Sequence, residues 1–137
     1  MPSMKILLIA GGWSSEREVS LTGARGMQEA LLKRGHAVTF FDLLENFDEL
    51  LETARQHDFA LINLHGSPGE DGLVQAMLEK ADCPYQGSGP SGSFLALNKA
   101  AAKQIFRMAG LPTADWEFLP VRPAEGWEPR LPWPLFV

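Results

Sequence analysis

Three short apolar runs, at residues 5–10, 37–41 and 59–64, are separated by longer stretches in which apolar and polar positions alternate with a helical period. Each short run is typical of a β-strand, and the first is apolar on both faces, as a central strand of a parallel sheet is. The resulting order of strand and helix predicts an α/β fold, with a parallel sheet flanked by helices on both faces.

The helices between these strands are marked by their end signals. The first is predicted to end near Arg34, with Gly35 just beyond it. Its apolar stripe contains Val19, Met27 and Leu31, and two nearby glycines indicate close packing against the sheet. The second is expected at 46–56, starting with a capping box, and the third at about 72–80.

The pattern changes after residue 87. Two helical stretches are expected at 91–97 and 98–109, followed by a proline-rich remainder with strands at 116–119 and 134–137. We therefore expect an N-terminal α/β domain at 1–97 and the incomplete start of a second domain at 98–137. An apolar run at the end would leave the backbone groups of a lone strand unpaired, so we expect part of a longer protein.

Composition narrows the class of protein. The 137 residues carry a net charge of −5 without a cluster of Lys or Arg, which argues against nucleic acid as the partner. No apolar stretch approaches the roughly 20 residues of a membrane span, and the start is not a signal peptide. The single Cys83 excludes an internal disulfide. A cytoplasmic location is expected.

Two loops rich in glycine follow the first and third predicted strands, at residues 11–18 and 65–72. Ligands of open α/β sheets bind beyond the carboxyl ends of such strands, so the loops are expected to form two walls of one site. In the first loop, Glu16 can bind a substrate ammonium group or can merely favour the helix dipole. The first helix can start either with a capping box of Ser15 and Glu18 or with Ser20 as its N-cap, and the sequence leaves both alternatives open.

The second loop contributes His65, which is either a hydrogen-bonded structural residue or part of a site. Glu70 and Asp71 have helix capping as an alternative role, and the distribution of histidines does not favour a metal site. A P-loop motif is missing. The G-x-G-x-x-G fingerprint of nicotinamide-dependent oxidoreductases is missing too. Asp42, at the end of the second predicted strand, is the only acidic candidate to bind a ribose hydroxyl.

Lys99 is expected in the first turn of a helix capped by Asn98. A cation there faces the positive end of the helix dipole, which is locally unfavourable. A bound phosphate would resolve the conflict, whereas the alternative is a solvated surface lysine.

The motifs at 11–20, 65–72, 84–89, 98–99 and 110–112, in this order and spacing, resemble those of the D-alanine–D-alanine ligases of the ATP-grasp superfamily. The resemblance covers almost the whole chain. It implies a Rossmann-like domain that binds the first D-alanine, followed by the start of the ATP-grasp central domain. It also implies peptidoglycan synthesis in cell-wall biogenesis and the maintenance of cell shape.

The resemblance implies a role for individual residues. Glu16 would bind the ammonium of the first D-alanine, Val19 would line that subsite, and His65 would lie near the reacting carboxylate. Lys99 would contact an ATP phosphate. Asn98 stands where many relatives carry Asp, a change of little consequence because Asn also caps helices.

The implied reaction forms an acyl phosphate from the first D-alanine and ATP, which the amine of the second D-alanine then attacks. Mg²⁺ would neutralise the phosphates, with its ligands outside this chain. A homodimer is expected, and the chain alone should not catalyse ligation. A D-alanine–D-lactate type ligase and a non-catalytic module that binds a small ligand remain alternatives.

Overall fold

The computed structural model describes residues 2–135. The chain divides into two compact units, with bounds at Met1–Leu97 and Asn98–Val137. The first unit contains a three-stranded sheet of β1 (Lys5–Ala10), β2 (Ala37–Asp42) and β3 (Phe59–Ile62). Its helical segments are α1 (Arg17–Lys33), α2 (Leu43–Asn46), the 3₁₀ turn η1 (Phe47–Glu49), α3 (Leu50–Ala54), α4 (Leu73–Lys80) and α5 (Pro90–Leu97).

The sheet is parallel and has the order β2-β1-β3, so the predicted α/β fold with a parallel sheet is confirmed. The central strand β1 pairs along its length with β2, and Ala60 of β3 also bridges to Tyr85 in the extended piece after α4. Residues Leu7 to Ala10 are fully buried, as expected of a strand covered on both faces.

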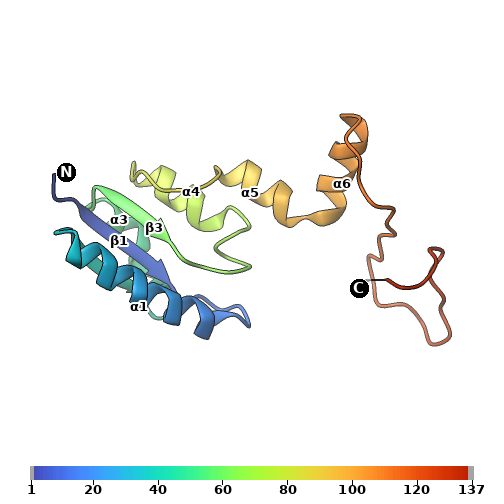
Figure 1. Cartoon of the computed structure of the whole chain (residues 1–137), viewed down its shortest axis with the longest axis horizontal. Coiled ribbons are helices and arrows are strands. Elements are labelled where there is room, and N and C mark those ends of the chain that lie inside the picture. Colours follow the sequence, from blue (N-terminus) through green and yellow to red (C-terminus); the bar gives the residue numbers. More distant parts are fainter. Residues whose placement is uncertain (1, 136–137) are drawn as a thin grey trace. The chain divides into compact units, whose positions relative to one another are not determined.

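Alternate residues of β1 face two separate hydrophobic layers. Leu8 and Ala10 pack with Ala24 of α1, whereas Leu7 and Ile9 join a larger cluster on the other face, which includes residues of α3 and α4. Helix α1 therefore covers one face of the sheet and α3 and α4 cover the other (Figure 1). This two-sided burial fixes the register of β1 and the positions of the loops that follow it.

The buried side of α1 differs from the predicted stripe. Val19 is 62% exposed and Met27 is 38% exposed, while the small residues Ser20 and Ala24 face the sheet. Small side chains at positions i and i+4 let the helix approach the sheet closely. The predicted end of this helix is confirmed, since Arg34 is the C-cap and Gly35 has a φ of +84°.

The segment predicted as one helix at 46–56 is helical in part, but its predicted start and its capping box are wrong. Helical structure starts earlier, at Leu43, because the Asp42 carboxylate accepts a hydrogen bond from the Leu44 N–H and caps α2. The segment then passes through η1 into α3, and the Asn46 side chain makes no capping hydrogen bond. The third predicted helix is confirmed as α4, in which Val74 and Leu78 are buried and Leu73 is 41% exposed.

The second unit contains α6 (Lys99–Met108), whose N-cap Asn98 accepts a hydrogen bond from the Ala101 N–H at 3.1 Å, as the sequence predicts. The strand predicted at 116–119 is not formed. Of the strand predicted at 134–137, residues 134 and 135 are not in a strand and the remaining two lie outside the described residues. None of the helices within 2–135 is sufficiently long and apolar to cross a membrane.

Two glycines should respond oppositely to alanine. Gly26 lies inside α1 with open space around it, so Gly26→Ala should stabilise the fold by about 0.5–1 kcal/mol through helix propensity. Gly72 has a φ of +93°, and a Cβ there would lie 2.4 Å from the Pro90 carbonyl oxygen. Gly72→Ala should therefore destabilise the fold by roughly 1–3 kcal/mol. Urea unfolding measures both variants, and equal midpoints would contradict the assignment.

Candidate functional site

The loops that follow β1 and β3 lie close enough together that a side chain added to a glycine of one would touch the other. A Cβ built on Gly12 would lie 3.3 Å from Leu64 Cδ2 and 3.5 Å from Pro68 Cδ. One built on Gly66 would lie 3.5 Å from the Ser14 Cβ. Because parallel strands place their carboxyl ends at the same edge of the sheet, the segments that carry Glu16 and His65 meet there.

Ser20 joins these two loops from inside α1. Its side chain is fully buried, and its hydroxyl accepts a hydrogen bond from the Gly11 N–H at 2.8 Å and donates one to the Asn63 carbonyl. The Asn63 amide returns a hydrogen bond to the Ser20 carbonyl at 2.7 Å. Its local sequence suggests only an N-cap role for Ser20. The signal for this buried role is its position one turn before Ala24, on the buried side of α1.

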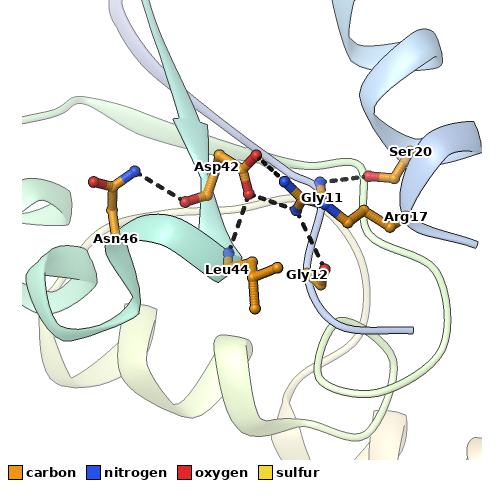
Figure 2. A network of polar contacts seen from close by, with 7 residues as sticks. All are labelled: Gly11, Gly12, Arg17, Ser20, Asp42, Leu44 and Asn46. Carbon is orange, nitrogen blue, oxygen red and sulfur yellow. Dashed lines mark hydrogen bonds and ion pairs between the residues drawn. The ribbon is translucent and has the colours of Figure 1, made fainter. Parts of the chain in front are cut away.

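Arg17 and Asp42 form a bidentate ion pair beside this joint (Figure 2). The two nitrogen–oxygen distances are 2.7 Å for Nη1–Oδ1 and 2.6 Å for Nη2–Oδ2. Arg17 Nη1 also donates to the Gly12 carbonyl at 3.3 Å. The hydrogen bond from Arg17 holds the pKa of the Asp42 carboxyl below its ordinary value, and the same contact raises the pKa of Arg17. Asp42, considered above for a ribose, is thus engaged within the fold.

Glu16 is the N-cap residue of α1, but its side chain makes no capping hydrogen bond. Neither of the predicted start signals is used, since α1 starts at Arg17 and Ser20 lies within the helix. The Glu16 N–H instead donates to the Ser14 hydroxyl at 3.2 Å. The Glu16 carboxylate is exposed at the sheet edge, and Glu18 is the acidic residue of the first helical turn.

The other wall of the site is held by its own carboxylates. Glu70 accepts a hydrogen bond from the Gly66 N–H at 2.8 Å, which closes the loop directly after the half-buried His65. Asp71 accepts from the Leu73 N–H at 3.0 Å and from the Ser67 hydroxyl, and Gly72 is the N-cap of α4. Glu70 and Asp71 therefore shape the loop, and of the two only Asp71 bonds to α4, whose N-cap is Gly72 rather than either predicted capping residue.

Lys99 is the exposed first residue of α6 and belongs to the second compact unit, whereas Glu16 and His65 belong to the first. Within residues 2–135, no group of three or more His, Cys, Asp and Glu side chains is placed to hold a metal ion.

The chain is similar to curated proteins over nearly its whole length. It is 76% identical over 134 residues to a D-alanine–D-alanine ligase of Desulfovibrio desulfuricans and 69% identical to one of Nitratidesulfovibrio vulgaris. This chain belongs to the D-alanine–D-alanine ligase family. No protein-family model matches the sequence. Each comparison includes 98% of this chain, but the chain spans only 44% of the length of each of the two ligases.

Solved structures of ligases have the same fold. A Bacillus anthracis D-alanine–D-alanine ligase complexed with ATP superposes with a TM-score of 0.77 at 39% identity, over 85% of this chain and 38% of that one. A D-alanyl-alanine synthetase A of Vibrio cholerae gives a TM-score of 0.69 at 30% identity, over 87% of this chain and 41% of that one. The parallel α/β fold of this ligase-family chain is thus the one found in ATP-grasp ligases.

The Arg17–Asp42 pair predicts a pH dependence of stability. Because the folded-state pKa of Asp42 lies below the unfolded-state pKa, the pair stabilises the fold fully above the ordinary value near 3.8. This contribution is lost as the pH falls through the folded-state pKa. The free energy of unfolding of the wild type should therefore exceed that of Asp42→Asn near neutral pH, and the difference should shrink in acid.

Urea unfolding across the acid range measures this difference. Glu52→Gln is the matched control, since Glu52 pairs with Arg55 at an exposed position and such pairs contribute little to stability. A difference between wild type and Asp42→Asn that stays constant down to the lowest pH would contradict the prediction.

Proposed function

We propose that this chain is the N-terminal part of an ATP-dependent ligase that joins two D-alanines to D-alanyl-D-alanine for peptidoglycan synthesis. The observation that carries the proposal is the close approach of the two strand-end loops that bear Glu16 and His65, in a chain 76% identical to a ligase of that name. The compact unit at 1–97 would bind the first D-alanine, and the unit at 98–137 would be the start of the ATP-binding domain.

Glu16 is proposed to bind the ammonium group of the first D-alanine. Its carboxylate is exposed and makes no capping hydrogen bond, so it is available for an external cation. A fixed ammonium group orients the substrate carboxylate for reaction and prevents this amine from acting as the nucleophile. The exposed Val19 would line the same subsite, and His65 on the facing loop would lie near the reacting carboxylate.

Lys99 is proposed to contact an ATP phosphate. Its ammonium group lies at the N-terminal end of α6, where the helix dipole disfavours a cation and favours an anion. A phosphate between them would satisfy both the lysine and the free N–H groups of the helix end. We propose that the remaining ATP contacts and the Mg²⁺ ligands lie outside this chain.

The proposed reaction has two steps. The carboxylate of the first D-alanine attacks the γ-phosphorus of ATP, which forms an acyl phosphate and releases ADP. The amine of the second D-alanine then attacks the acyl carbon, and phosphate leaves. The residues of this chain hold the first substrate in both steps, so by itself the chain is proposed to be inactive in ligation.

The second substrate is set by residues outside the chain, so a D-alanine–D-lactate type ligase would share these features. The names of the similar proteins favour D-alanine. Cytoplasmic location, where ATP is available, and a homodimeric assembly belong to the same proposal.

The function is tested in the complete ligase that carries this chain, by following ADP release and dipeptide formation. Glu16→Gln should raise the KM for the first D-alanine by about 10- to 100-fold, because the charged partner of the ammonium is lost. Glu18→Gln is the matched control, since Glu18 is also acidic and lies in the first turn of α1. Unchanged kinetics of Glu16→Gln at both D-alanine subsites would reject the role of Glu16, and absence of dipeptide in the wild type would reject the function.

Lys99→Ala should raise the KM for ATP by about tenfold with a smaller effect on both D-alanine KM values, as expected for one lost charge-assisted contact. Lys80→Ala is the control, because Lys80 is an exposed lysine in the last turn of α4, on the other compact unit. A KM for ATP equal to that of the wild type would show that Lys99 is an ordinary surface lysine.

A further inference from the structure

Arg17 directly follows Glu16, yet its side chain turns away from the exposed loop and into the fold, where it meets the end of β2. We propose that the Arg17–Asp42 ion pair is a positioning device, which holds the Glu16 carboxylate where it can bind the ammonium of an amino-acid substrate. The inference rests on the proposed function and adds residues that do not themselves touch the substrate.

The guanidinium of Arg17 joins three parts of the chain. It extends from the first residue of α1, forms two parallel bonds to Asp42 at the end of β2, and donates to the Gly12 carbonyl in the loop between β1 and α1 (Figure 2). Glu16 lies between Gly12 and Arg17 in the sequence, so both chain segments that flank it are tied to one group. A bidentate guanidinium–carboxylate pair fixes orientation as well as distance.

The backbone at Gly11 is shaped to this pair. Gly11 has a φ of +78°, and a Cβ there would lie 2.5 Å from Arg17 Nη1 and 2.6 Å from Asp42 Oδ1. Any side chain at Gly11 would therefore displace the pair. The same residue is fixed from its other side, since its N–H donates to the buried Ser20 hydroxyl. The loop that leads to Glu16 thus has its conformation set by Ser20 and Arg17 together.

Asp42 is itself held in place by strand pairing and by further hydrogen bonds. Asp42 ends β2 in register with Ala10, its Oδ1 accepts from the Leu44 N–H at 3.1 Å, and its carbonyl accepts from the Asn46 amide at 3.1 Å. The side chains of Arg17 and Asp42 are 23% and 14% exposed. Partial removal from water makes such a pair more persistent than an exposed one.

Loss of the pair should free the loop rather than unfold the sheet. The hydrophobic clusters on both faces of β1 contain neither Arg17 nor Asp42, and of the two only Asp42 takes part in the pairing of β1, as the last partner in β2. By contrast, the N-cap residue Glu16 has no capping side-chain bond of its own to keep it in place. The effect should therefore concentrate on binding of the first substrate.

The test uses the complete ligase with Arg17→Met, Arg17→Lys, Asp42→Asn and the double variant Arg17→Met/Asp42→Asn. The KM for the first D-alanine should rise roughly tenfold in Arg17→Met and Asp42→Asn, below the ~100-fold that a 1 Å misplacement can cause. The KM for ATP should stay unchanged. Arg17→Lys should lie between wild type and Arg17→Met, because lysine keeps the charge but not the fork.

The double variant should be no worse than the more affected single variant, since both changes break the same pair. Arg55→Met is the matched control, because Arg55 pairs with Glu52 at an exposed position away from the sheet edge. All variants are compared well below their unfolding midpoints, so that a loss of folded protein lowers kcat alone and is separated from a change in KM.

Two results would overturn the proposal. One is an unchanged KM for the first D-alanine in Arg17→Met and Asp42→Asn while Glu16→Gln raises it; the proposed function would then stand without the positioning role. The other is an effect that is not specific to the pair and the first substrate: an equal rise in the KM for ATP and for D-alanine, or additive effects in the double variant, which would show that Arg17 and Asp42 act independently. If Glu16→Gln itself has no effect, it is the proposed role of Glu16 that fails.

Discussion

Parallel pairing of β1 with β2 on one side and β3 on the other determines where the polar side chains of this molecule meet. Ala10 is in register with Asp42, and Ile9 is in register with Ile62, so all three strands end at the same edge. The chain leaves each strand there with backbone groups that no further strand can pair. Gly11 and Asn63 follow immediately, and Ser20 brings these two loops, distant in sequence, together at this edge.

Helix α1 supplies the partners that these loop groups need. The Ser20 hydroxyl serves the Gly11 N–H and the Asn63 carbonyl, and Arg17 serves the Gly12 carbonyl and the Asp42 carboxylate. The helix can do this because its buried residues, Ser20 and Ala24, are small and let it lie close to the sheet. Polar contacts of this kind contribute specificity of geometry beyond their modest net stability, because an unpaired buried group would be costly.

Elements with strong local signals were predictable from the sequence, whereas those decided by tertiary contacts were not. The strands, the end of α1 at Gly35 and the Asn98 cap follow from apolar runs and cap residues. The start predicted for the helix at 46–56 is wrong because Asp42, at the end of a strand, caps a helix four residues before the predicted N-cap Asn46. The 116–119 segment has strand-like composition, but a strand requires a partner, and the sequence carries no information on one.

The same contrast explains the site. Glu16 and His65 stand out because they follow apolar runs in glycine-rich loops, but the pairs Arg17–Asp42 and Ser20–Asn63 join residues far apart in sequence. Helical periodicity gives the reason why one short motif contains both kinds of residue. Arg17 and Ser20 are three positions apart and face the fold, while Glu16 and Val19, also three apart, are exposed. The start of α1 therefore exposes on one side the two residues that we propose to bind the first substrate, and is tied to the fold on the other. On that proposal, substitutions of Arg17 or Ser20 should act on binding through Glu16 and Val19.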